Sequence, residues 1–302
     1  MHMGRTRAAY VRYTASLILF GSNGIVAAYI AASSTSIVFW RTLIGSLALI
    51  AVFMATRQHL TVFGNAKDRL FMIASGVSTG LSWIFLYAAY RLAGVGISTL
   101  IYYLGPILVM AVSPILFHEP LTRGKLLAFA AVLVGMVLLN GNTVQSGGDL
   151  TGILFAFGSA VCHAFMVVFN KLAARVQGLE NPTLQLTISF LTVAVAIIVV
   201  PSLTLEVPFD SWLPMIFLGL VNTGLGCYLY FSSIGDLKAQ TVVVLGYLEP
   251  LSAVVMAVMI LGEVMSPAQV VGAVLVLGGA LVAEALPSKS KASKSKAAAD
   301  ID

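Results

Sequence analysis

The sequence contains few charged residues. Only 10% of its 302 residues are Asp, Glu, Lys or Arg, whereas 59% are hydrophobic. A soluble globular protein has about 25% charged residues. The chain therefore has too few polar side chains to cover a surface exposed to water, and we predict a polytopic membrane protein whose outer surface contacts membrane lipid.

Cysteines and catalytic motifs are equally scarce. The two cysteines, Cys162 and Cys227, lie in apolar runs and are interpreted as packing residues. The sequence has no HExxH motif, no Cys–His metal spacing, no P-loop and no dinucleotide fingerprint. We therefore expect no metal, no cofactor, no ATP-driven transport by this chain alone and no enzymatic activity. The string GVSTG, residues 76–80, matches the hydrolase nucleophile pattern, but within an apolar run it indicates a close helix contact.

The hydrophobic residues form long uninterrupted runs. A hydrocarbon core about 30 Å thick needs about 20 helical residues to cross it. We predict an all-α integral membrane protein with ten transmembrane helices and no cleavable signal peptide. The predicted spans are 10–31, 36–56, 68–90, 95–117, 122–140, 150–172, 183–204, 211–233, 239–261 and 267–286.

The distribution of Lys and Arg predicts the orientation of these spans. With residues 1–9 in the cytoplasm, all of the 17 basic residues except Arg41 and Arg91 fall on the cytoplasmic side. We therefore expect a multi-pass membrane protein with both termini cytoplasmic. The residues that give the net charge of +5 then lie at the membrane surface. This location accounts for the positive charge, and no nucleic-acid partner is expected. The tail 287–302 is basic and of low complexity, and we predict a disordered segment that is either solvated or in contact with anionic lipid.

The sequence repeats itself with an offset of 144 residues. The repeat divides the chain into halves at 10–140 and 150–286, each with five spans. Two halves with an odd number of spans must cross the membrane in opposite directions, which is the inverted-repeat plan of many secondary transporters. We therefore predict two inverted five-helix repeats around a central cavity, a plan compatible with a monomer. The equivalent pairs are Pro106 with Pro250, Glu119 with Glu263, Thr122 with Ser266, and Gly135 with Gly279.

The two prolines lie near the middle of their spans, in the strings YLGP (103–106) and YLEP (247–250). Proline inside a helix removes one backbone hydrogen bond and clashes with the preceding turn. We predict paired hinges at Pro106 and Pro250, with Gly105 and Gly246 beside them. The alternative is a pair of static kinks that serve packing. Glu119 and Glu263 are interpreted as acidic residues at helix exits, where one helix ends. Each is followed by a residue with a hydroxyl group, Thr122 or Ser266, that forms the N-cap of the next helix.

Several residues in the middle of the spans are candidates for binding a substrate. Tyr103 and Tyr247 precede the prolines by three residues, so each shares a helix face with its proline. The aromatic residues of the third and eighth spans occupy equivalent helices, and we assign them either to the cavity wall or to helix packing. His163 and Asn23 either line the cavity or bond a neighbouring helix. The candidates are Tyr103, Tyr247, Trp83, Tyr87, His163, Tyr228, Asn23 and Glu249.

Glu249 is the only carboxylate deep inside a predicted span. An ionised side chain at the bilayer centre costs several kcal/mol. We expect no Lys or Arg at the same depth to pair with it, so Glu249 should be neutral or face the cavity. Its predicted role is a proton-linked or amine-binding group, and the alternative is a neutral acid that donates a hydrogen bond to a nearby carbonyl.

These features resemble the drug/metabolite transporter superfamily over residues 10–286. The resemblance rests on the Glu-x-x-Ser/Thr strings, the glycine-bearing last helix of each half and the sequence FWRTL around Arg41. It points to the ten-helix EamA-type branch and, within it, to bacterial exporters of aromatic and other neutral amino acids (the YddG type). The resemblance implies a protein of the bacterial inner membrane that exports a small, largely apolar metabolite by alternating access. The alternatives are a proton-coupled multidrug exporter that uses Glu249, a sugar-phosphate or nucleotide-sugar carrier, and a passive facilitator.

Overall fold

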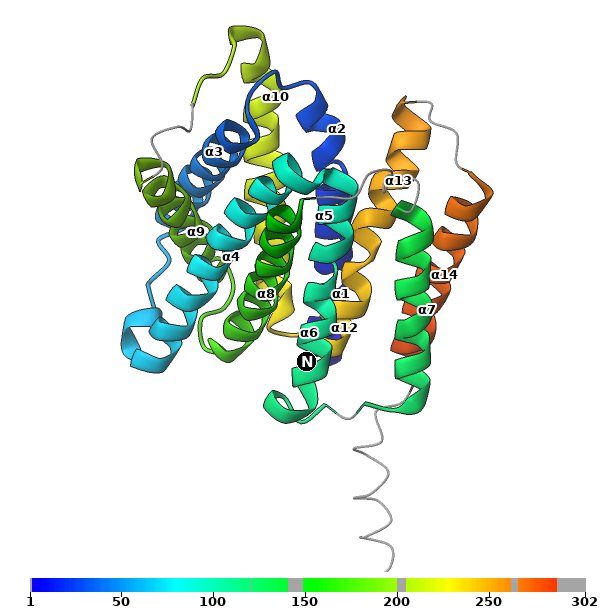
Figure 1. Ribbon diagram of the computed structural model, residues 1–302. Helices are drawn as coiled ribbons and strands as arrows, with labels where there is room; N and C mark the ends of the chain where they lie inside the picture. The colour runs from blue at the N-terminus through cyan, green and yellow to red at the C-terminus, as the bar shows by residue number, and fades with distance from the viewer. Residues whose placement is uncertain (1, 120, 141–148, 200–204, 262–265, 287–302) are drawn as a thin grey trace, which may run out of the picture.

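The computed structural model describes residues 2–119, 121–140, 149–199, 205–261 and 266–286. All regular secondary structure in these residues is helical, and all ten predicted spans are present (Figure 1). Six spans are single helices: α3 (Ser34–Ala55), α4 (Ala66–Ala93), α7 (Arg123–Asn140), α8 (Leu150–Leu172), α9 (Glu180–Val199) and α14 (Pro267–Ala285).

The other four spans are interrupted. The first consists of α1 (His2–Gly21) and α2 (Asn23–Ala28), the fourth of α5 (Val95–Tyr102) and α6 (Leu104–Leu116), and the ninth of α12 (Ala239–Gly246) and α13 (Leu248–Leu261). The eighth contains a 3₁₀ turn η3 (Phe209–Ser211), α10 (Trp212–Phe217), a π-helical segment η4 (Leu218–Leu225) and α11 (Gly226–Ile234). The interruption of the first span and the π-helical segment were not predicted. Residues 2–9, predicted to precede the first span, already belong to α1.

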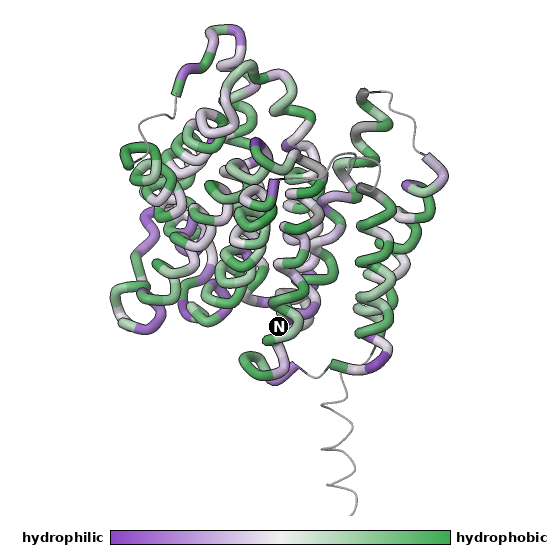
Figure 2. Tube along the Cα trace, in the orientation of Figure 1, coloured by the Kyte–Doolittle hydropathy of each residue, from purple (hydrophilic) through white to green (hydrophobic). Residues whose placement is uncertain are grey.

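The outer surface of the helical bundle is apolar. In the part of the chain that the structure describes, seven helical stretches are long and apolar enough to cross a membrane. Large hydrophobic side chains such as Ile198, Leu213 and Met259 are more than three-quarters exposed, with exposed fractions of 78%, 79% and 79%. Hydrophilic residues are concentrated at the two ends of the bundle (Figure 2). Exposure of this many apolar side chains along the helices is expected of a surface in contact with lipid.

We call the end of the bundle that contains the start of α1 the basic end. The connections α3–α4, α6–α7, α8–α9 and α11–α12 all lie at this end (Figure 1). It is the end predicted to face the cytoplasm. Its basic residues with described side chains are Arg7, Arg12, Arg57, Lys67, Arg69, Arg123, Lys125, Lys171, Arg175 and Lys238.

Helices α7 and α14 contact each other through equivalent residues of the two halves. A Cβ atom added at Gly135 would lie 2.7 Å from the carbonyl oxygen of Gly272, and one added at Gly279 would lie 2.7 Å from that of Ala128. Gly272 follows Ala128 by the same 144 residues that separate the two glycines. Reciprocal contacts of this kind are expected between segments related by a two-fold axis. The inverted repeat of the sequence is therefore also a symmetry of the fold.

This contact gives a prediction about stability. In Gly279→Ala the new methyl group would clash with backbone and with Val132, and overpacking of this kind costs about 1–3 kcal/mol. We expect a lower melting temperature of the purified protein in detergent. The control is Gly278→Ala, because Gly278 is exposed and has open space at its Cβ position. Equal melting temperatures of the two variants would contradict the close contact.

The helix-capping predictions are confirmed where they can be followed. Ser266 and Gln269 form a capping box at the start of α14, with Pro267 at its first position. The hydroxyl of Thr122 accepts a hydrogen bond from the backbone N–H of Lys125 at 3.3 Å. Glu263 and the tail 287–302 lie outside the described residues.

Glu119 has a different role from the predicted helix exit. Its two carboxylate oxygens accept hydrogen bonds from the backbone N–H groups of Ala239 at 2.8 Å and Gln240 at 2.9 Å. It therefore caps the N-terminus of α12 in the other half of the protein. The physical reason is that a carboxylate is stabilised by the partial positive charge at a helix N-terminus and not by a C-terminus.

Candidate functional site

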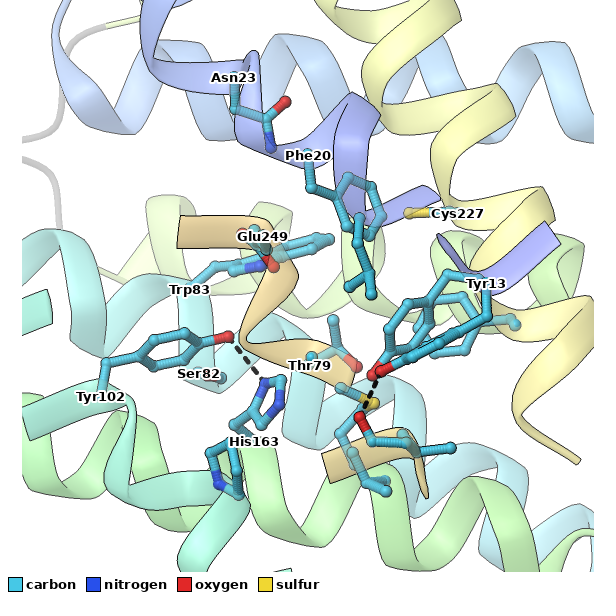
Figure 3. Close-up of a pocket in the computed structure, with 18 of the residues that line it drawn as sticks. Tyr13, Phe20, Asn23, Thr79, Ser82, Trp83, Tyr102, His163, Cys227 and Glu249 are labelled. Atoms are coloured by element: carbon cyan, nitrogen blue, oxygen red, sulfur yellow. Dashed lines mark hydrogen bonds between the residues drawn. The ribbon is translucent and has the colours of Figure 1, made fainter. Parts of the chain in front are cut away.

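A cavity of about 120 Å³ lies between the two halves of the protein. This volume is large enough for several water molecules or a small solute. Its wall is built by the α1–α2 span, α3, α4 and the α5–α6 span of the first half, and by α8, η4, α11 and the α12–α13 span of the second. Figure 3 shows the cavity with a selection of its lining side chains.

Most of the predicted site residues line this cavity. Five of the eight predicted substrate-binding residues do so, together with two of the four predicted hinge residues. They are Asn23, Trp83, Tyr103, His163, Glu249, Pro106 and Gly246.

The other five predicted residues lie outside the lining. Tyr87 packs edge-on against Tyr90, with ring centres 5.5 Å apart. Tyr228 packs against the hydrophobic core, and Tyr247 is fully buried. Gly105 packs closely against α8, where an added Cβ would lie 2.9 Å from the carbonyl oxygen of Ala160, and Pro250 is buried in α13.

The interruptions of the fourth and ninth spans contact each other. Each helix breaks at a tyrosine, Tyr103 or Tyr247, and restarts so that Pro106 or Pro250 lies in the first turn of the next helix. In a first turn the missing N–H of proline has no helical partner to lose. The hydroxyl of Tyr247 donates a hydrogen bond to the carbonyl oxygen of Tyr103 at 3.0 Å. The two breaks are thus joined by a hydrogen bond from the tyrosine of one to the backbone of the other.

His163 forms a hydrogen-bonded pair at the cavity wall. Its Nδ1 atom lies 2.7 Å from the hydroxyl oxygen of Tyr102, and the two rings meet edge-on (Figure 3). Both predictions for His163 therefore apply. Its ring forms a hydrogen bond with a neighbouring helix, and it also lines the cavity. Tyr102 is among the lining residues that sequence reasoning missed, although it is the residue just before the predicted Tyr103.

Sequence reasoning also missed Tyr13 and Phe20 of α1, which form an aromatic cluster with Tyr230, one of the aromatic residues predicted in the eighth span. Tyr13 and Tyr230 lie with ring centres 5.2 Å apart, and Phe20 lies 5.9 Å from Tyr230. The hydroxyl of Tyr13 donates to the carbonyl oxygen of Val242 in α12 at 2.7 Å. The sequence signal for Tyr13 and Phe20 was weak, because aromatic residues are common in apolar spans and usually serve helix packing.

The π-helical segment η4 positions a polar residue in the cavity. The amide nitrogen of Asn222 donates to the carbonyl oxygen of Leu19 at 2.9 Å and to the hydroxyl of Ser22 at 2.7 Å. The Asn222 amide thereby provides a hydrogen-bond donor to a backbone carbonyl group where the first span is interrupted. A π-helical turn adds a residue to the helix and often occurs at a functional site.

Arg41 and Glu249 both line the cavity, which corrects one prediction. We expected no cation at the depth of Glu249, because Arg41 comes early in its span. The long side chain of Arg41 reaches inward from the second turn of α3, and its guanidinium carbon lies 4.8 Å from the centre of the Trp83 ring. No ion pair within 4.0 Å joins Arg41 and Glu249 among the described residues.

Between the cavity and the basic end lies a layer of contacts that joins the two halves. We call it the basic-end contact layer, and it is centred on the connection between α11 and α12. Lys171 donates to the carbonyl oxygens of Ile234, at 3.2 Å, and Leu237. Arg12 pairs with Asp236 at 3.9 Å. The layer consists of Arg12, Glu119, Lys125, Lys171, Asp236 and Gln240.

The order of residues along each helix places this layer on the basic-end side of the cavity. In α12 the cavity lining begins at Val242, one turn after the N–H groups that bind Glu119. In α8 the lining ends at Val167, one turn before Lys171. Lys125 donates to the side-chain oxygen of Gln240 at 2.9 Å, and both residues are buried. In the described residues, no group of three His, Cys, Asp or Glu is placed to hold a metal ion.

Comparisons with known proteins agree with this architecture. The sequence profile of the EamA-like transporter family matches residues 10–141 and again 150–284. The uncharacterized transporter YxxF of Bacillus subtilis (strain 168) is 25% identical over 261 residues, which cover 84% of this chain and 82% of the relative. The threonine/homoserine exporter RhtA of Escherichia coli (strain K12) is 26% identical over 234 residues, covering 76% of this chain and 74% of the relative. A crystal structure shares the fold with a TM-score of 0.80 at 22% identity, over 94% of this chain and 100% of the solved chain.

The ten spans, the two symmetric halves and the cavity between them define a multi-pass membrane transporter. The two profile matches run over nearly the same residues as the two predicted halves. This chain belongs to the EamA-like transporter family, within the drug/metabolite transporter superfamily.

Proposed function

We propose that this protein exports small, largely apolar metabolites by alternating access, with aromatic and other neutral amino acids as the main substrates. The observation that carries this proposal is the lining of the cavity. Seven of the 24 lining residues are tyrosine, tryptophan or phenylalanine, and one cation and one carboxylate, Arg41 and Glu249, line the same cavity. Apolar walls with a few placed polar groups are typical of sites for small molecules.

The direction of transport and the substrate class have further support from a relative. The similar protein RhtA is a threonine/homoserine exporter, so export of neutral amino acids occurs in a protein 26% identical to this one. The predicted orientation, with both termini in the cytoplasm, would place the basic-end contact layer on the side from which an exporter takes up its substrate.

Alternating access requires that the protein can close the cavity on each of its two sides. We call the contacts that do so on one side a closure. We assign the closure in this conformation to the basic-end contact layer. In the alternative conformation its contacts to the α11–α12 connection would break. The interruptions at Tyr103 and Tyr247 would allow the outer and inner parts of their spans to move separately.

A second candidate function is a multidrug exporter of lipophilic cations that uses Glu249. The carboxylate and the aromatic rings favour cations. Arg41 opposes this function, because a cationic substrate would share the cavity with a buried guanidinium.

The test is counterflow in proteoliposomes preloaded with unlabelled solute. We expect accumulation of labelled L-phenylalanine or L-threonine and none of tetraphenylphosphonium. Liposomes without protein are the control, and parallel runs with and without a pH gradient distinguish coupled from passive transport. Accumulation of tetraphenylphosphonium with no accumulation of either amino acid would replace the proposed function by the second candidate.

A further inference from the structure

The cavity contains buried polar atoms without partners. Among the described residues, Arg41 Nε, Asn23 Oδ1 and Asn222 Oδ1 are buried and make no hydrogen bond, and all three residues line the cavity. More than about 90% of buried polar groups in proteins are hydrogen-bonded, so each exception needs an explanation. One donor and two acceptors without partners in one cavity indicate a ligand that has both kinds of group.

The orientation of the Asn222 amide follows from its neighbours. Its nitrogen faces the carbonyl oxygen of Leu19, which can only accept a hydrogen bond. The opposite orientation would place two acceptors against each other. The Oδ1 atom of Asn222 is therefore the side that remains free to accept a hydrogen bond.

The acceptors lie together at the interruption of the first span. Asn222 bonds Ser22, and Asn23 is the next residue along the chain. Glu249 lies close by, since a Cβ atom added at Gly21 would be 2.9 Å from the carbonyl oxygen of Glu249. Figure 3 shows Asn23 and Glu249 among the side chains that line the cavity. We call Asn23, Asn222 and Glu249 the acceptor cluster.

The donor lies apart from this cluster. Arg41 belongs to α3 and packs on the face of Trp83 from α4. Its guanidinium makes no hydrogen bond or ion pair with another described residue. The N–H groups of a guanidinium can bind a carboxylate through two parallel hydrogen bonds.

We propose that the cavity binds the two charged groups of an amino acid at separate places, the carboxylate at Arg41 and the ammonium group at the acceptor cluster. This inference rests on the proposed function and specifies its chemistry. A zwitterion satisfies both places and leaves the net charge of the cavity unchanged. An amine without a carboxylate leaves the guanidinium unpaired, and an acid without an ammonium group leaves Glu249 unpaired. Leaving one buried charge unpaired is strongly unfavourable.

The experiment compares L-phenylalanine with two analogues that each lack one charged group. Phenethylamine lacks the carboxylate and 3-phenylpropionate lacks the ammonium group. Each is titrated against the purified protein, and binding is measured as the rise in melting temperature, which depends on ligand concentration and affinity. L-threonine is titrated as a second amino acid. For the natural protein we expect each analogue to bind at least about tenfold more weakly than L-phenylalanine, which corresponds to about 1.4 kcal/mol.

Two variants should reverse these preferences in opposite ways. In Arg41→Gln, L-phenylalanine should lose its advantage over phenethylamine but keep its advantage over 3-phenylpropionate. In Glu249→Gln, the advantage over 3-phenylpropionate should disappear and the advantage over phenethylamine should remain. Arg91→Gln is the matched control, because Arg91 is exposed and lies outside the cavity, and it should behave like the natural protein.

The outcomes separate this inference from the proposed function. If the natural protein binds an amino acid but binds both analogues equally well, the separate charge sites are wrong and the proposed function stands. If both variants weaken all ligands by the same factor, Arg41 and Glu249 have only structural roles and the inference is overturned. If the natural protein binds neither amino acid, the proposed function and the inference both fail. The comparison within the natural protein does not depend on the folding of any variant.

Discussion

Replacing Glu119 by alanine is expected to open the cavity toward the basic end. Glu119 holds the first two N–H groups of α12 from the opposite half of the protein. Loss of a side-chain cap at a helix N-terminus costs up to about 2 kcal/mol, which is about 30-fold in an equilibrium constant. The conformation closed at the basic end should therefore lose population to the conformation open at that end.

The measurement uses a cysteine that the chain already has. Cys227 lines the cavity and is 3% exposed. In a Cys162→Ala background it is the only thiol, so its reaction with a membrane-impermeant thiol reagent added on the basic-end side reports access to the cavity. We expect Glu119→Ala to raise the rate of this reaction by about 30-fold, in line with the shift in population.

The matched control is Glu180→Ala. The carboxylate of Glu180 also accepts two backbone hydrogen bonds at the basic end, from Thr61 at 2.7 Å and Val62 at 2.9 Å. These groups belong to the connection between α3 and α4 and do not touch α12. The control should lose similar stability without a change in the reaction rate of Cys227. An equal increase in both variants would mean that access follows general destabilisation, and no increase in either would remove Glu119 from the closure.

A leucine at position 246 is expected to abolish binding and transport while leaving the fold intact. Gly246 lines the cavity, and a Cβ atom added there would meet only the hydroxyl oxygen of Tyr13, at 3.6 Å. A leucine side chain would extend into the cavity and occupy space that the substrate needs. Overpacking a filled site costs about 1–3 kcal/mol, which corresponds to a loss of affinity of up to about 100-fold.

The variant Gly246→Leu is tested by counterflow of L-phenylalanine and by its melting temperature. Leucine has a higher helix propensity than glycine by about 0.8–1 kcal/mol, so the melting temperature should stay the same or rise. Gly278→Leu is the control, because this glycine is also helical, is exposed, and has open space at its Cβ position outside the cavity. Normal transport by Gly246→Leu would show that the substrate does not pass through the cavity described for this protein.

Some residues of the site could be predicted from the sequence and others could not. Pro106, Tyr103, His163 and Glu249 were predicted because each is unusual in the middle of an apolar run. Such residues stand out against hydrocarbon, where a polar group or a helix break is costly. The free oxygen of Asn222 could not be predicted, since it depends on a π-helical turn and on the interruption of another helix.

The sequence by itself determined the ten spans, their division into two halves and the breaks in the fourth and ninth spans. These features follow from local properties of the chain, namely the length of apolar runs, the position of proline and the offset of 144 residues. The symmetric contact of Gly135 and Gly279 also agrees with a repeat that the sequence contains.

Only the tertiary structure decided which polar groups meet. Arg41 comes early in its span and Glu249 near the middle of another, yet one cavity receives both side chains because a long arginine side chain can reach inward. Glu119 follows a helix of the first half and caps a helix of the second, 120 residues away. Hydrogen bonds and charges act over a few ångströms in space, and helix packing, which no local pattern specifies, sets those distances.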